Sequence, residues 1–194
     1  MMVDAMAKSK RQKEIAESMT RSKYDTADLS SLYERYYERI YRFCVHRLYC
    51  SESAEDVTSS VFLAVASKLT DFKGETEDDF KNWLYAIAAN MSNSHIRKSL
   101  RHRDLLKKNA TIIADTNEDV RSKKDNWPEV YSAISTLKPL SQTIITLRYF
   151  ENFTHEQIAQ VVDKKPSTVR VILHRSLKAL KKNLKTVSSG VYNG

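Results

Sequence analysis

Residues 154–185 constrain the fold more than any other part of this 194-residue chain. Thr154 and Gln157 have the spacing of a capping box, which marks the start of a helix. An apolar run follows, and residues 163–165 then interrupt it before Pro166, which is tolerated as the first residue of a helix. The pattern therefore predicts two helices joined by a tight turn.

The second of these helices has one apolar face and one basic face. Its apolar residues recur at helical spacing: Val169, Leu173, Leu177, Leu180 and Leu184. No acidic residue occurs between Lys164 and Lys185. A helix dipole favours lysines near a helix C-terminus. It explains neither the break at residues 163–165 nor the polar residues 167–170 in the first turn of the second helix. The layout is typical of a helix-turn-helix and predicts a nucleic-acid partner.

The composition predicts an all-α protein. Only three glycines and three prolines occur, and no long alternation of apolar and polar residues indicates a strand. The net charge of +8 is uneven, because residues 51–56 and 71–79 are acidic whereas residues 95–108 and 164–185 are basic. Such a distribution predicts at least two surfaces, one of which binds a polyanion.

Several kinds of site and location are disfavoured. No apolar stretch approaches the roughly 20 residues of a membrane span, and the N-terminus does not read as a signal peptide, so a cytoplasmic protein without membrane insertion is expected.

Cys44 and Cys50 are too few for a disulfide framework. Together with His46 they fall short of the four ligands of structural zinc, so we expect two small buried residues and no metal or cofactor.

Helical patterns divide the chain into two small domains. The first, residues 24–104, contains predicted helices at 29–48, 53–68 and 76–103, with Leu32, Tyr36, Ile40 and Phe43 as a core stripe. The second, residues 127–188, contains helices at about 127–137 and 141–150, followed by the helix-turn-helix. Residues 105–126 are predicted to be a flexible linker with a short helical start at residues 105–108, residues 1–23 an extension and residues 189–194 a tail.

The order of these parts resembles an extracytoplasmic-function (ECF) RNA polymerase sigma factor. The residues that carry the resemblance in the first domain are Leu32-Tyr33-x(2)-Tyr36, Ala54-Glu55-Asp56-Val57-Thr58 with Phe62, Phe72-Lys73-Gly74, and Phe80-x-x-Trp83-Leu84-Tyr85-x-Ile87-Ala88-x-Asn90. In the second they are Leu147-Arg148-Tyr149, Thr154-x-Glu156-x-Ile158-Ala159, Thr168-Val169-Arg170 and Leu173-His174-Arg175. A helix-turn-helix alone occurs in many regulators, whereas the string from Trp83 to Asn90 ahead of it is more specific.

The resemblance implies a polymerase surface and two DNA surfaces. The residues implied in binding the clamp helices of core RNA polymerase are Glu55, Asp56, Ser59 and Phe62. The residues implied at the −10 element are Phe72, Lys73, Asn90, Arg97, Lys98, Arg101 and Arg103. The residues implied at the −35 element are Ser167, Thr168, Arg170, Val171, His174, Arg175 and Lys178.

Their chemistry suits these roles. A base flipped from the −10 duplex needs an apolar wall, for which Phe72 is the candidate, and a polar group such as Asn90 to read its edge. For each of these two residues an ordinary structural role, a loop anchor or a helix-packing group, stays open. Basic residues 97–103 would bind phosphates, which raises affinity without choosing a sequence. Ser167, Thr168 and Arg170 are the expected base readers.

Some residues depart from the family pattern. Asp163 stands where glycine is usual, Val171 where serine is common and Ile172 where arginine is frequent. Ser53 and Ser59 occupy positions often held by aspartate and glutamine in the polymerase-binding helix. These differences affect the expected promoter sequence and contacts rather than the class.

The resemblance also implies how the chain works and with what it assembles. Core polymerase would bring both domains to promoter DNA, the second also docking on the polymerase flap, and no small-molecule substrate is expected. Many family members are held by an anti-sigma factor, and the sequence leaves open whether this one is. Free in solution, the two domains are expected to pack together and mask their DNA surfaces.

Two other classes of protein fit the sequence less well. A transcriptional regulator with the same C-terminal fold would need a sensory domain or a dimerisation helix, and the sequence shows neither. A nucleic-acid enzyme would need metal-spaced carboxylates, an activated nucleophile or a glycine-rich phosphate loop. Gly74 is the only glycine before the C-terminal tail, which excludes such a loop, so we expect no enzymatic activity.

Overall fold

The computed structural model describes residues 29–109 and 128–191, and every element in these ranges is helical. The first unit consists of α2 (Leu29–Leu48), α3 (Ser51–Lys68), a short 3-10 helix η2 (Leu69–Asp71) and α4 (Glu77–Asn109). The second consists of α5 (Pro128–Ser135), α6 (Pro139–Tyr149), α7 (His155–Val161) and α8 (Pro166–Val191). The predicted all-α fold is confirmed, whereas the extension, most of the linker and the end of the tail lie outside the described residues.

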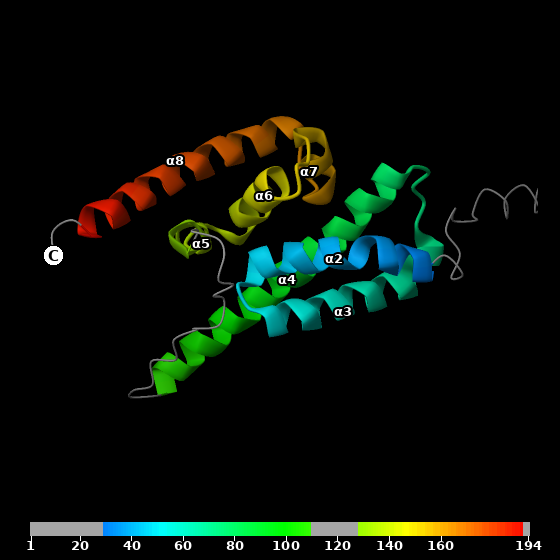
Figure 1. Ribbon diagram of the computed structural model, residues 1–194, viewed down its shortest axis with the longest axis horizontal. Helices are drawn as coiled ribbons and strands as arrows, with labels where there is room; N and C mark the ends of the chain where they lie inside the picture. The colour runs from blue at the N-terminus through cyan, green and yellow to red at the C-terminus, as the bar shows by residue number, and fades with distance from the viewer. Residues whose placement is uncertain (1–28, 110–127, 192–194) are drawn as a thin grey trace, which may run out of the picture.

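The first unit is a bundle of α2, α3 and α4 (Figure 1). The predicted stripe of Leu32, Tyr36, Ile40 and Phe43 is buried, and so are Val57, Val61 and Val65 on α3. Fully burying a side chain of this size contributes about 1.5–3 kcal/mol, so this stripe is a main source of stability. The predicted helix 29–48 also has the bounds that the structure shows.

Two predicted helix starts are confirmed by their hydrogen bonds. The backbone N–H of Asp79 donates to the Thr76 hydroxyl at 3.0 Å, and the Asp79 carboxylate accepts from the Thr76 backbone N–H at 3.0 Å. The Thr76 hydroxyl also donates to the Asp79 carboxylate at 2.7 Å, and this bond, together with the one from the Thr76 backbone N–H, holds the pKa of Asp79 below its usual value. Thr154 and Gln157 form the full capping box at α7. Each of these two caps satisfies backbone groups that a helix end otherwise leaves unpaired.

Other predicted boundaries are wrong. Helix α3 begins at Ser51 rather than Ser53, because Ala54 N–H already donates to Cys50 C=O at 3.0 Å and closes the first turn. Cys50 therefore precedes α3, and the expectation of two buried cysteines holds for Cys44 but not for Cys50, which is only partly buried. Helix α4 continues to Asn109 rather than ending at residue 103, so the helical start expected at residues 105–108 is the end of α4, because residues 104–109 are mostly good helix formers.

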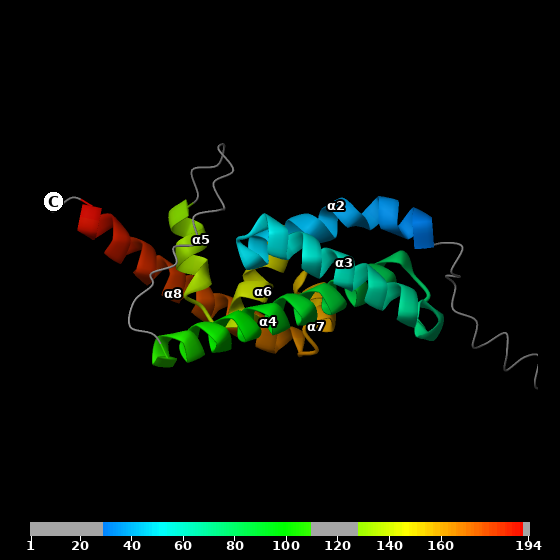
Figure 2. The same ribbon diagram turned by 90° about the horizontal axis from the view of Figure 1, so that it is seen from below.

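The second unit follows the predicted pattern with small shifts. Pro139 opens α6 two residues before the expected start, and Pro166 is the first residue of α8 as predicted. Its core is built from Ile144, Leu147, Phe153, Ile158 and Val169, all fully buried. Helices α6 and α7 lie between α8 and the first unit, and α5 lies beside α8 (Figures 1 and 2).

Asp163, where the family usually has glycine, adopts the left-handed conformation in the turn between α7 and α8. Its φ is 50°, a region that glycine enters without steric cost. We expect Asp163→Gly to raise the free energy of unfolding by up to about 1 kcal/mol. Urea denaturation checks this, with Asp163→Ala as a control that should destabilise the protein. A gain of stability in Asp163→Ala would show that the turn is unstrained.

Candidate nucleic-acid interface

Helix α8 presents the predicted recognition surface. Val169 and Leu173 are buried against α6 and α7, which turns the opposite face outward. The predicted base and phosphate contacts on that face are all exposed: Ser167, Thr168, Arg170, Val171, His174, Arg175 and Lys178. Ile172 is half-buried and packs on the core, so in this chain the position that often carries arginine supports the helix instead.

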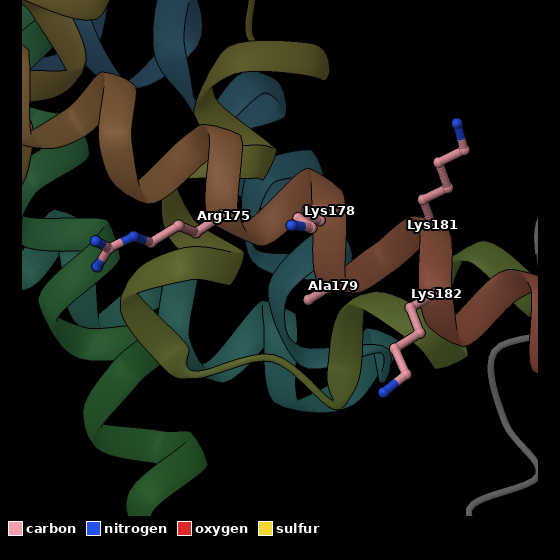
Figure 3. Close-up of a pocket in the computed structure, with 5 residues that line it drawn as sticks. All are labelled: Arg175, Lys178, Ala179, Lys181 and Lys182. Atoms are coloured by element: carbon pink, nitrogen blue, oxygen red, sulfur yellow. The ribbon is translucent and has the colours of Figure 1, made fainter.

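The middle of α8 carries a shallow basic depression. It is lined by Arg175, Lys178, Ala179, Lys181 and Lys182, and Figure 3 shows their side chains fanning out from one helix in different directions. Cations spread around one helix, without enclosing walls, suit an extended polyanion better than a small ligand.

Arg170 is the one predicted base reader with an ion pair among the described residues. Its Nη2 donates to Glu156 Oε1 at 3.0 Å across the turn between α7 and α8. A backbone hydrogen bond, reinforced by Arg170, holds the pKa of Glu156 below its usual value. Both side chains are largely exposed, so the pair is weak and orients the guanidinium without preventing it from binding elsewhere.

Helix α4 carries the second basic surface. Asn90, Arg97, Lys98 and Arg101 are exposed along it, while Phe80, Leu84 and Ala88 are buried on another side. Arg103 lies near the end of the helix, and its side chain is outside the described part of the chain. Exposed cations in line along a helix can follow a nucleic-acid backbone.

The loop before α4 is held from beneath by Phe72. Lys73 is exposed, but Phe72 is only 7% exposed and packs on Phe80 and Trp83, with ring centroids 5.7 and 5.0 Å away. Gly74 lies directly over this ring, since a Cβ there would be 2.2 Å from Phe72 Cζ. The close approach requires glycine at position 74 for packing rather than for an unusual φ.

A third surface, on α2 and α3, is acidic with an apolar centre. Glu55, Asp56 and Ser59 are exposed on α3, and the Phe62 ring is buried against Tyr33 at 4.9 Å between centroids. Beside it, Leu63 is 73% exposed and Tyr33 43%. An exposed apolar group within an acidic rim is typical of a protein-binding surface rather than a DNA-binding one.

Comparisons with known proteins match both units. Residues 32–102 match the model of Sigma-70 region 2, and residues 128–180 match that of Sigma-70 region 4. The chain belongs to the sigma-70 family. It is an ECF sigma factor, and it directs promoter-specific transcription initiation by RNA polymerase.

Individual relatives agree with this assignment. The sigma factor is 29% identical to the ECF RNA polymerase sigma factor BldN of Streptomyces coelicolor, over 77% of this chain and 57% of BldN. It is 26% identical to the RNA polymerase sigma factor YlaC of Bacillus subtilis, over 80% of this chain and 91% of YlaC. A solved structure of Bartonella quintana sigma factor RpoE, in complex with the anti-sigma factor NepR, has the same fold. Its TM-score is 0.63 at 19% identity, covering 81% of this chain and 97% of RpoE.

The structure separates the predicted site residues of the sigma factor into exposed and buried ones. Every predicted site residue whose side chain lies in the described part of the chain is exposed, except Phe62 and Phe72. Sequence reasoning missed Leu63 and Tyr33 as surface groups. Leu63 carried a usable signal, because it falls out of phase with the buried residues Val57, Val61 and Val65. No helix in the described part of the sigma factor is long and apolar enough to cross a membrane.

Proposed function

We propose that each of the three surfaces of this sigma factor has a separate binding role in transcription initiation. Exposed Ser167, Thr168 and Arg170 read the −35 duplex from the major groove, and the cations further along α8 bind phosphates. The basic end of α4 holds the −10 DNA, and Asn90 reads a flipped base. The observation that carries this proposal is the exposure of both basic faces on helices whose other sides are buried.

Phe72 acts in this scheme as the floor of the −10 loop. Its ring is packed on Phe80 and Trp83, so it positions Lys73 and the loop over the start of α4. A base captured here would rest against this aromatic cluster, which helps to offset the few kcal/mol that unstacking costs.

The acidic surface on α2 and α3 binds the clamp helices of core polymerase. Glu55, Asp56 and Ser59 supply polar contacts, with Phe62 supporting them from below. Exposed Leu63 adds an apolar anchor that the partner would cover. The second unit docks on the polymerase flap. An anti-sigma factor is a further proposed partner, because the similar RpoE was solved with one.

Run-off transcription tests this function directly. The purified chain and bacterial core polymerase are added to a fragmented genomic library, with core polymerase alone as the control. Discrete transcripts that require the chain are expected, and their start sites would define both elements. Specific binding of duplex DNA without any transcripts would favour a helix-turn-helix regulator instead.

The Leu63 anchor makes a separate prediction. Leu63→Ala is expected to weaken core polymerase binding by roughly fivefold or more, because a buried apolar contact is worth on the order of 1 kcal/mol. Stability should stay unchanged, since the side chain is exposed in the free protein. The affinity is measured by titrating labelled core polymerase. Ser67→Ala, exposed on the same helix, is the matched control, and equal affinities for both variants would remove Leu63 from the interface.

A further inference from the structure

Val171 is an apolar side chain on a polar surface. It is 48% exposed, and among the described side chains of α8 it is the one large apolar group that is exposed. The nearby apolar residues Val169, Ile172 and Leu173 are buried or half-buried against the rest of the second unit. A single exposed apolar residue is ordinary on a protein surface, so its place on the helix decides whether it has a role.

That place is almost directly opposite the buried side of α8. The buried side is defined by Val169, Leu173 and Ser176, which are 0%, 7% and 5% exposed. Successive residues of an α-helix are rotated by about 100°, so Val171 lies about 200° around the axis from Val169. It therefore points within roughly 15° of the direction opposite to the middle of the buried side.

The outermost line of α8 is thus the line that meets the floor of a groove. It runs through Ser167, Val171 and Lys178, whereas Arg170 lies on the flank beside α7, where it pairs with Glu156. Val171 is the sixth residue of α8, within the N-terminal part of a recognition helix that contacts base edges. The packing of the two units leaves this line uncovered, contrary to the expected masking.

Valine restricts what can be recognised at this point. Its side chain has no hydrogen-bond donor or acceptor, and the apolar group that base edges present in the major groove is the C5-methyl of thymine. Against the amino group of cytosine or the oxygen of guanine, valine would displace water without replacing its hydrogen bond. A helical valine also keeps nearly one rotamer, so its two methyl groups are already fixed before contact.

We propose that Val171 reads the C5-methyl group of a thymine in the −35 element. The contact adds a required A·T pair to that element, at a position where the serine common in the family would offer a hydrogen bond instead. Burial of one such apolar group is worth about three- to fivefold in affinity. The inference rests on the proposed binding of α8 in the −35 major groove.

Removal of single methyl groups from the DNA tests the contact. The start sites of the run-off transcripts first locate the −35 element. Each of its thymidines is then replaced in turn by deoxyuridine, which lacks only the C5-methyl group. Competition experiments measure the affinity of the full chain, assembled with core polymerase, for each promoter duplex. We expect one of these substitutions to weaken binding by about three- to fivefold.

Val171→Ala should abolish that single difference. The shorter side chain no longer reaches the methyl group, so thymine and uracil at this position should bind the variant equally well. Lys178→Ala, on the same outermost line, is the matched control. It should weaken binding to every promoter while it keeps the preference for thymine over uracil. Circular dichroism should show folded proteins of wild-type thermal stability, because both side chains are exposed.

Methylated cytosine supplies the complementary experiment. The A·T pair is replaced by a G·C pair with cytosine on the strand that carried the thymine, which should weaken binding. 5-Methylcytosine then returns a methyl group to the same place in the groove. We expect wild type to regain about threefold in affinity and Val171→Ala to regain none.

Two results would overturn the inference. One is a −35 element without thymine, and the other is a deoxyuridine cost that is the same for wild type and Val171→Ala at every −35 position. Deoxyuridine in the −10 element should affect both proteins alike and serves as the control for the DNA. Failure to bind any promoter would count against the proposed function as well, whereas specific binding without methyl dependence would count against Val171 alone.

Discussion

Phe72→Ala is expected to destabilise the first unit by about 3–5 kcal/mol, the usual cost of removing a buried phenylalanine. The ring fills the space beneath Gly74 and contacts both Phe80 and Trp83, so its removal leaves a cavity at the start of α4. Opening of the −10 DNA should fail as well, because the loop loses its floor. Urea denaturation followed by circular dichroism gives the stability, and permanganate reactivity of promoter thymines gives the opening.

Two matched variants separate packing from DNA contact. Lys73→Ala, exposed and adjacent, should stay within about 0.5 kcal/mol of wild type and alter only DNA affinity. Phe72→Leu keeps most of the volume, so it should restore much of the stability. If Phe72→Leu is stable but cannot open promoters, the aromatic face itself contacts the base. Wild-type stability in Phe72→Ala would contradict the packing that the structure shows.

Arg170→Ala and Arg101→Ala should change promoter binding in different ways. A side chain that reads a base edge carries about 1–3 kcal/mol of discrimination, so Arg170→Ala should weaken the best promoters most and relax the −35 preference. Arg101 lies among the cations of α4, so Arg101→Ala should weaken all promoters similarly and lower the salt-dependence slope by about one. Binding to a library of promoter variants at several salt concentrations measures both effects.

The ion pair between Arg170 and Glu156 allows a further test of this difference. Glu156→Gln releases Arg170 without removing it, so the −35 preference should survive in that variant. Lys138→Ala, an exposed cation at the start of α6 and outside both sets of proposed DNA-binding residues, serves as the charge control. Identical promoter profiles for Arg170→Ala and Arg101→Ala would contradict the proposed division of labour.

Local signals in the sequence predicted most of the secondary structure. The helix-turn-helix was predictable because its capping box, turn and apolar stripe are all encoded within 32 consecutive residues. The start of α3 was mispredicted for a physical reason. Ser53 and Asp56 have cap-like spacing, but the backbone bond from Ala54 to Cys50 had already begun the helix. The exposure of the cations on α4 and α8 was predicted correctly. The apolar face of each helix packs on the core, so the basic face opposite it meets solvent.

Contacts between distant residues were not predictable in this way. Arg47 continues the spacing of the buried stripe on α2, but a charged residue at such a position is almost never fully buried unless it is paired, and its partner Gln142 is 95 positions away. Arg47 looks like an ordinary charged residue near a helix end, where the helix dipole favours it. The burial of Phe72 was equally hidden, because a phenylalanine in a loop can anchor the loop or face a ligand. Only the packing against Phe80 and Trp83 distinguishes these roles.

The close approach of Gly74 to the Phe72 ring has a consequence for related sequences. Because there is no room for a Cβ at position 74 while a full aromatic ring occupies position 72, the two positions should evolve as a pair. Lineages that acquire alanine or serine at 74 are expected to carry a smaller residue at 72 together with a loop shifted away from Asp79, whose Cβ would lie 2.7 Å from the new Cβ, or to have a different loop length before α4. The loop over the −10 DNA would then vary between sigma factors in a correlated manner, and promoter preference at that element should change with it.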